Sequence, residues 1–159
     1  MKIYYQDTEN TDITASINRL QFLVDKIPAL MKQIPDSEFS AKPAPGKWSK
    51  KEILGHLVDS ASNNHQRFIR IQYQDKPSIA YDQDQWVALH AYNTFDSHRL
   101  IEFWEIYNRL LLHIIKNIPA QNLVRTGIVN SADEEMSLAF YINDYVVHLE
   151  HHLRQLVNY

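Results

Sequence analysis

Apolar residues recur at intervals of three and four along the first part of the chain, which is the spacing of one face of an α-helix. The positions on this face are Ile13, Ile17, Leu20, Val24, Ile27, Met31 and Ile34. They predict a helix packed against a core, with Thr11 or Asp12 as its N-cap. Pro28 lies within the pattern, and we expect it to kink or interrupt the helix, because proline has no backbone N–H to donate.

A capping box opens the second predicted helix. Ser49 is followed three residues later by Glu52, so each side chain is able to bond the other's backbone N–H. The helix is expected to run from Ser49 to about Tyr73. The connection that follows, residues 75–93, is long and is expected to contain a helical turn around Trp86.

Two more helices are predicted in the second half of the chain. One follows Ser97 and ends near Pro119; its apolar face consists of Leu100, Phe103, Tyr107, Leu110 and Ile114. The other begins near Ser137 and reaches the C-terminus; its apolar face consists of Leu138, Ile142, Tyr145, Leu149 and Leu156. The best strand signal is GIVN (127–130), which favours a short extended segment between these helices.

Together these segments predict an all-α protein built as a four-helix bundle. Because the connections after the second and third helices are long, the helices need not follow one another in a simple up-down-up-down order. A chain of 159 residues is the size of one ordinary domain, so we treat residues 1–159 as a single domain.

Composition narrows the class of protein. Hydrophobic residues make up 45% of the chain and charged residues 22%, which is typical of a soluble globular protein. A net charge of -3 argues against nucleic-acid binding, and no apolar run is long enough to span a membrane. The chain has no cysteine, which excludes disulfides and thiolate metal ligands. Its N-terminus has no apolar core of a signal peptide, so we expect a cytoplasmic protein.

The unusual chemistry lies in HLEHHLRQL, residues 148–156. His148 and His152 are four residues apart and therefore share one helix face, as two ligands of one metal must. Periodicity places His152 in the core slot between Leu149 and Leu156, and His151 in solvent. Two interpretations are open: the pair binds a metal with a third ligand from elsewhere, or each imidazole hydrogen-bonds a buried tyrosine or carbonyl.

Periodicity does not choose a third ligand among the other histidines. His56 falls on the polar flank of the second helix, together with Asp59, Ser60 and Asn63. His90 and His98 lie in or beside the long connection and are expected at the surface. His113 is surrounded by apolar residues in sequence and is expected to be a core histidine.

A resemblance supplies the missing ligand. KWSKKEILGHLVDS (47–60) followed by HLEHHLRQL (148–156) resembles the DinB-like family of four-helix-bundle metalloproteins, which belongs to the DinB/bacillithiol-transferase-like superfamily. The positions that match the family pattern are Trp48, Glu52, His56, His148, His152 and Gln155. The resemblance implies that His56, His148 and His152 bind one divalent transition metal (zinc, nickel or iron). It also implies an up-down-down-up helix order and, by family habit, a homodimer.

The resemblance also implies a range of activities. A three-histidine site leaves coordination positions open, as catalytic metal sites do, and acidifies a bound water or a small thiol. The leading hypothesis is a small-thiol S-transferase acting on electrophilic small molecules. A metal-dependent hydrolase is the alternative within enzymes. A non-catalytic metal- or ligand-binding bundle and a metal-free homodimeric interaction module are the alternatives outside them.

Several side chains are candidates for supporting the site. Metal-bound imidazoles usually donate their second N–H to a carboxylate or carbonyl, which makes Asp59, Asp144 and Glu150 candidate acceptors. Asn63, two turns beyond His56, is a candidate for hydrogen-bonding a substrate. The alternative for each is a surface or packing role. Tyr141 and Tyr145 stand near His148 on the same helix and either line a pocket or belong to the core.

Overall fold

The computed structural model describes residues 2–129 and 134–159. Its α-helices are α1 (Thr14–Met31), α2 (Asp36–Phe39), α3 (Lys50–Arg70), α4 (Gln83–His90), α5 (Ser97–Lys116) and α6 (Leu138–Leu156). Two 3-10 turns, η1 (Tyr92–Thr94) and η2 (Ala120–Asn122), flank α5. The strands β1 (Thr126–Ile128) and β2 (Glu135–Ser137) form a small antiparallel hairpin in which Gly127 lies opposite Met136. The all-α prediction is confirmed.

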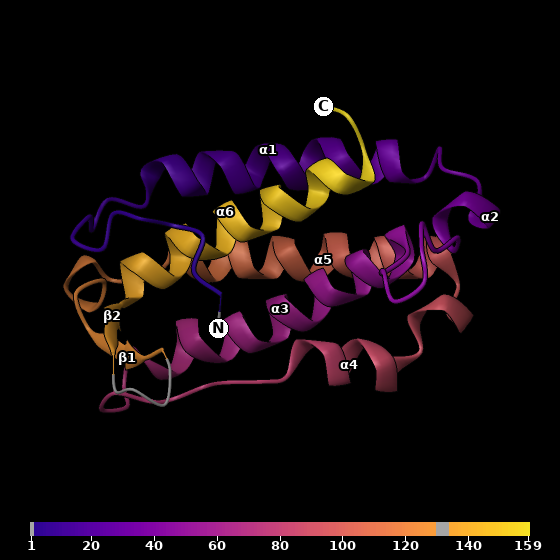
Figure 1. Ribbon diagram of the computed structural model, residues 1–159. Coiled ribbons are helices and arrows are strands. Elements are labelled where there is room, and N and C mark those ends of the chain that lie inside the picture. The colour runs from indigo at the N-terminus through magenta and orange to yellow at the C-terminus, as the bar shows by residue number, and fades with distance from the viewer. Residues whose placement is uncertain (1, 130–133) are drawn as a thin grey trace.

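The four long helices α1, α3, α5 and α6 form one bundle, with α1 and α6 running in one direction and α3 and α5 in the other (Figure 1). This is the up-down-down-up order that the family resemblance implies. Parallel neighbours cannot be joined by a short turn, so the chain returns along the whole length of the bundle between α3 and α5. Helix α4 lies on this return, where the sequence predicts a helical turn around Trp86.

Local hydrogen bonds begin α3 and α6 where the sequence predicts. The Ser49 hydroxyl accepts a hydrogen bond from the Glu52 backbone N–H (3.1 Å), and the Glu52 carboxylate accepts one from the Ser49 N–H (2.7 Å). Ser137 caps α6 by accepting from the Phe140 N–H. At α1 the predicted N-cap, Thr11 or Asp12, is wrong: the N-cap residue is Ile13, and the Asp12 carboxylate accepts from the Thr14 N–H at 2.8 Å just before the helix. Polar side chains therefore fix where α3 and α6 start.

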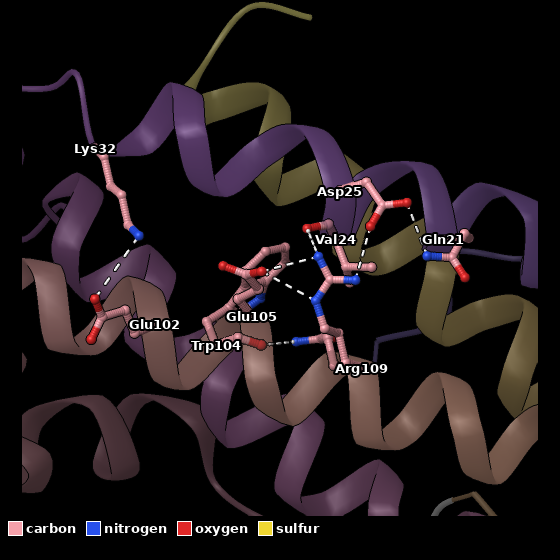
Figure 2. A network of polar contacts seen from close by, with 9 residues as sticks. Gln21, Val24, Asp25, Lys32, Glu102, Trp104, Glu105 and Arg109 are labelled. Atoms are coloured by element: carbon pink, nitrogen blue, oxygen red, sulfur yellow. Dashed lines mark hydrogen bonds and ion pairs between the residues drawn. The ribbon is translucent and has the colours of Figure 1, made fainter.

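Pro28 was expected to kink or interrupt the first helix. Helix α1 is not interrupted and continues through Pro28 to Met31. Proline leaves the Val24 carbonyl without its usual intrahelical donor. In the structure, Nη2 of Arg109 on α5 donates to that carbonyl at 3.3 Å, and the same guanidinium bonds Asp25 and Glu105 (Figure 2). A long side chain from the neighbouring helix thus replaces the missing donor, and only the last turn of α1 follows the proline.

The core fills the space between the four helices. Its largest fully buried side chains include Trp104, Tyr145, Phe39, Phe68 and Phe140. The expectation of a core position for His113 is wrong: it is exposed on α5, because Leu111, Leu112 and Ile115 take the inward positions. His90 and His98 are exposed, as expected.

The predicted extended segment is partly confirmed. Gly127 and Ile128 belong to β1, Val129 lies just beyond it, and position 130 lies outside the described residues. In the part of the chain that the structure describes, no helix has the length and apolar character that crossing a bilayer requires.

Candidate metal centre

The packing of α3 against α6 brings three histidines together. His56 comes from the first half of α3, and His148 and His152 come from successive turns of α6. One ring nitrogen from each lies within 4.8 Å of the other two. The Nε2 atoms of His56 and His148 are 3.1 Å apart.

The distance between His56 and His148 fits a transition-metal ion, whereas the full group, which spreads over 4.8 Å, must draw closer for all three nitrogens to bind one ion. Imidazole nitrogens bind zinc at about 2.0–2.1 Å, so two of them at angles of about 90–109° are about 2.8–3.4 Å apart. The observed 3.1 Å lies in that range. Three imidazoles form a nitrogen donor set that zinc, nickel and iron accept. Three protein ligands also leave at least one position for a water or a substrate atom.

Burial keeps the three imidazoles in the form that binds metal. It lowers the pKa of His56 to about 4. Burial, and then the nearby His56, lower the pKa of His152 to about 4. The pKa of His148 lies well below its ordinary value, first because of burial and then because of His56 and His152. All three are therefore neutral at pH 7, as metal coordination requires.

Neighbouring side chains orient the rings. The Trp48 indole packs on the His56 ring with 5.1 Å between ring centroids, and Tyr4 packs edge-on against His148 at 4.9 Å. The Nδ1 atom of His148 is 3.3 Å from the Ser60 hydroxyl, which accepts the ring N–H when Nε2 faces the centre. His56 Nδ1 is buried, and no hydrogen-bond partner for it exists among the described residues.

The C-terminal turn of α6 supplies the contact to the third ring. The side-chain amide of Gln155 is 3.3 Å from Nδ1 of His152. The nitrogen and oxygen of a side-chain amide have nearly the same shape, so rotating the Gln155 amide by 180° exchanges them. The amide oxygen then accepts a hydrogen bond from an Nδ1–H of His152. Gln155 is one of the positions on which the family resemblance rests, and this contact gives it a physical role.

The inward slot of α6 belongs to a different residue from the one predicted. Leu153 is fully buried between Leu149 and Leu156, whereas His152 is only half-buried beside it. The periodicity estimate was therefore one residue off. His151 is exposed, as predicted. His148 is also half-buried, so the two α6 imidazoles lie at the edge of the core, where an ion and a substrate have access.

His56 is buried although it lies on the polar flank of α3. Only 1% of its surface is exposed, and Asp59, Ser60, Asn63 and Asn64 on the same helix are also buried. This flank faces α6, α4 and the N-terminal segment rather than solvent. Hydrophobic periodicity assigns polar residues to water, so it could not identify this face.

The candidate acceptors Asp59 and Glu150 have other partners. Asp59 accepts a hydrogen bond from the Tyr92 hydroxyl at 2.6 Å and lies 3.2 Å from Nδ1 of His90, so it ties α3 to the long connection. Glu150 pairs with Arg19 on α1 and with Arg154 on its own helix. Neither carboxylate forms a hydrogen bond with the three histidines.

Asp144 and Asn63 are placed differently from one another. Asp144 accepts hydrogen bonds from the backbone N–H groups of Tyr4 and Tyr5, and thereby holds the N-terminal segment against α6 and Tyr4 against His148. Asn63 donates to the Asp59 carbonyl within α3 at 2.9 Å. Asp144 thus supports the site through Tyr4, whereas Asn63 is a buried helix residue.

The two tyrosines named from the sequence are both buried. The Tyr145 hydroxyl donates to the Asn108 side chain at 2.5 Å, and the Tyr141 ring faces the Arg67 guanidinium. Tyr145 also reaches a small cavity next to the histidines.

That cavity, here called the polar recess, has a volume of about 60 Å³. Beside His56 and His148 it is lined mainly by Tyr4, Ser60, Asn64, Arg67, Tyr81 and Asp144. Its walls come from α3, α6, the N-terminal segment and the connection before α4. The one signal in the sequence was the helical spacing of Ser60, Asn64 and Arg67, which continues the His56 face along α3.

A larger groove lies next to the centre. This groove, here called the lysine groove, has a volume of about 690 Å³ and is lined by Lys42, Lys47 and Lys50, together with Trp48 and Gln155. Trp48 and Gln155 also contact the candidate ligands His56 and His152. Gln83 lines both the groove and the polar recess, so the two spaces adjoin.

The chain is similar to bacterial proteins whose names describe them as candidate metal-dependent hydrolases. It is 26% identical to YfiT of Bacillus subtilis over 140 residues, covering 84% of this chain and 78% of YfiT. It is 22% identical to a protein of Oceanobacillus iheyensis over 146 residues, covering 91% of this chain and 83% of the relative.

Solved structures share the fold, and a family model matches the sequence. The YfiT structure is described as having an unusual four-helix bundle topology. It superposes on this protein with a TM-score of 0.81 at 22% identity, and the match covers 96% of this chain and 89% of YfiT. A mycothiol-dependent maleylpyruvate isomerase gives a TM-score of 0.74 at 9% identity and covers 91% of this chain and 60% of the isomerase. Residues 19–156 match the model of the DinB superfamily, and the chain therefore belongs to that superfamily.

Proposed function

We propose that the protein is a metal-dependent enzyme that transfers a small thiol to electrophilic small molecules, with His56, His148 and His152 holding one divalent transition metal. The observation that carries the proposal is the convergence of three neutral imidazole nitrogens within 4.8 Å beside two accessible spaces. Zinc, nickel and iron all suit this donor set. The relatives named as candidate metal-dependent hydrolases support the metal dependence.

When bound, such an ion supplies Lewis-acid chemistry by lowering the pKa of a water or thiol that it holds. The surrounding side chains perform the remaining tasks. Trp48 and Tyr4 fix the ring planes of His56 and His148 and exclude water from one side of each. Ser60 and Gln155 hold the outer nitrogens of His148 and His152.

The two adjoining spaces favour a reaction between two organic reactants. The lysine groove is large enough for a thiol cosubstrate, while the polar recess admits only a small group. In the transfer, a sulfur–carbon bond forms as the bond between carbon and the leaving group breaks. The thiol proton departs with that leaving group. Hydrolysis would need only one organic reactant besides water, so it would not need room for a second.

Metal-dependent hydrolysis is the second candidate, and the names of the relatives favour it. The same residues would then hold the metal, and the groove would bind the substrate. A requirement for an added thiol distinguishes the two activities. A cytoplasmic location and a homodimer belong to the same proposal, and light scattering of the purified protein tests the dimer.

Elemental analysis of tag-free protein tests the metal site. We expect about one transition-metal ion per chain in the wild type and its loss in His56→Ala and His148→Ala. His151→Ala is the matched control, because it removes an exposed imidazole from the same helix. A wild type that retains no metal even after reconstitution would overturn the site.

Activity is then measured on the metal-loaded protein with 1-chloro-2,4-dinitrobenzene, in the presence and absence of glutathione, cysteine or mycothiol. Chloride release that needs a thiol and disappears in His148→Ala supports thiol transfer. Ester hydrolysis without a thiol supports the second candidate. Metal retention without turnover of either kind favours a non-catalytic metal-binding bundle.

A further inference from the structure

Arg67 is a buried arginine three turns beyond His56 on α3, and only 4% of its surface is exposed. Its Nη1 donates to the side-chain oxygen of Asn64 at 3.1 Å, and its Nη2 donates to the Ile79 carbonyl at 2.5 Å. The guanidinium also lies over the Tyr141 ring at 5.6 Å. These contacts hold the side chain in one place.

Arg67 forms no salt bridge in the part of the chain that the structure describes, although Asp144 lies near enough to act on its charge. Within residues 2–129 and 134–159, no carboxylate oxygen lies within 4.0 Å of its nitrogens, whereas the more exposed Arg19 and Arg109 both have carboxylate partners. A guanidinium has five N–H donors, and the two hydrogen bonds above use two of them. Burying a charge without a salt bridge is costly, and the donors left over are available to an anion that enters from outside.

Arg67 lines the polar recess that also contains His56 and His148. The other polar groups there are Asn64, Ser60 and the hydroxyl of Tyr81, and Lys2 adds a second positive charge. The acid in the lining is Asp144, whose carboxylate already accepts two backbone N–H groups. The recess therefore presents donors and positive charge to whatever enters it.

The size of the recess limits its ligand. Its volume is about 60 Å³, and one water needs roughly 10–15 Å³ in the same measure. A few non-hydrogen atoms therefore fit, which is enough for a carboxylate. The planar fork of arginine also matches the two oxygens of a carboxylate.

We propose that the polar recess binds the carboxylate group of a small acidic substrate through Arg67, and so directs the remainder of that substrate toward His56 and His148. The proposal rests on the proposed function, since it names the substrate class of the same site. It makes Arg67 a binding residue for the substrate, with Asn64 as the side chain that positions its guanidinium.

The test measures acetate binding by calorimetry with acetamide as the uncharged analogue, using tag-free full-length protein both as purified and after chelation. We expect acetate, and not acetamide, to bind in both states. Arg67→Gln should weaken acetate binding at least tenfold. Arg70→Gln removes the same charge from the solvent side of the same helix and should leave binding unchanged.

A second variant covers the case in which Arg67→Gln fails to fold. Asn64→Asp places a carboxylate where the amide oxygen now meets Arg67, so it supplies the missing counter-charge from within the chain. It should abolish acetate binding while keeping the guanidinium. Equal binding of acetate by wild type and Asn64→Asp would overturn the proposal.

The His152→Ala variant separates this proposal from the proposed function, because His152 belongs to the histidine group but does not line the recess. It should lose metal and still bind acetate through Arg67. If acetate binding is lost on chelation and is unchanged in Arg67→Gln, the anion binds the metal. That result would overturn the proposal and leave the proposed enzyme function intact. Absence of acetate binding in every state, or equal binding of acetamide, would also overturn it.

Discussion

Single residues determine the chemistry of the centre, and burial sets their charge. Desolvation is the largest cause of the low pKa of His56, His148 and His152, and repulsion by neighbouring histidines adds to it for His148 and His152. A neighbouring carboxylate would have the opposite effect and favour the protonated imidazole. Since Asp59 and Glu150 bond elsewhere, the three rings stay neutral and ready to bind a metal.

At this scale we predict how pH acts on the stability of the metal-free protein. The pKa of His56 is 6.5 when unperturbed and about 4 in the folded protein. Between these values the unfolded chain binds more protons than the folded one, so the free energy of unfolding falls as pH falls. His56→Ala should therefore show a smaller loss of stability between pH 7 and pH 5 in urea titrations.

The comparison with wild type isolates this effect. Burial raises the pKa of Asp59 and Asp144, so these carboxyl groups make the free energy of unfolding rise as pH falls. The quantity to measure is therefore the difference in pH dependence between wild type and His56→Ala. His151→Ala should retain the wild-type pH dependence. An identical pH dependence in His56→Ala and wild type would show that His56 is not held neutral by burial.

At the scale of elements, α6 presents core residues on one face and the candidate metal ligands on the face beside it. Leu153 fills the inward slot and His152 lies beside it. We predict that Leu153→Ala destabilises the protein by about 2–5 kcal/mol, as expected for a cavity in a packed core. His152→Ala should cost the metal-free protein clearly less and abolish metal binding. Chemical denaturation after chelation tests both, and a larger loss for His152→Ala would contradict this assignment of the helix faces.

Helix α3 contains a glycine whose role is close packing. A Cβ at Gly55 would lie 2.1 Å from a ring atom of Tyr92. Glycine to alanine inside a helix normally stabilises it by about 0.5–1 kcal/mol. Here we predict the opposite sign, a loss of about 1–3 kcal/mol from overpacking. Tyr92 bonds Asp59 one turn from His56, so the metal affinity should fall as well. A stabilised Gly55→Ala variant would contradict the packing.

The same two helices show which features can be predicted from the sequence and which cannot. The starts of α3 and α6 were predictable because the cap at Ser49 and the apolar repeat after Ser137 are local signals. The burial of Ser60, Asn64 and Arg67 was not, because polar residues on a helix face are read as solvated. Only the fold determines that this face packs against α6 and the N-terminal segment.

At the scale of the whole molecule, the site is assembled from distant parts of the chain. Tyr4 arrives from the N-terminus, Tyr81 from the long connection, and His148 from the last helix. The up-down-down-up order permits this, because the connection between two parallel helices must pass along the bundle. Periodicity carries no information about such neighbours, so the resemblance to a family was needed to join His56 to His148 and His152.

Because the proposed ligands come from α3 and α6, a bound ion should stabilise the entire bundle. At an ion concentration about 100 times the dissociation constant, the gain is about 2.7 kcal/mol. For a domain of this size, that corresponds to a rise in Tm of about 5–10 °C. Thermal unfolding of the chelated protein, with and without added zinc, measures the increase, which should remain in His151→Ala.

The increase should disappear in His56→Ala as well as in His148→Ala, although the two residues lie on different helices. Each variant is compared with itself after chelation, so any change in the stability of the metal-free form cancels. If zinc still raises Tm in His56→Ala but not in His148→Ala, the ion is held by α6 alone. The link between α3 and α6, and with it the three-histidine centre, would then be wrong.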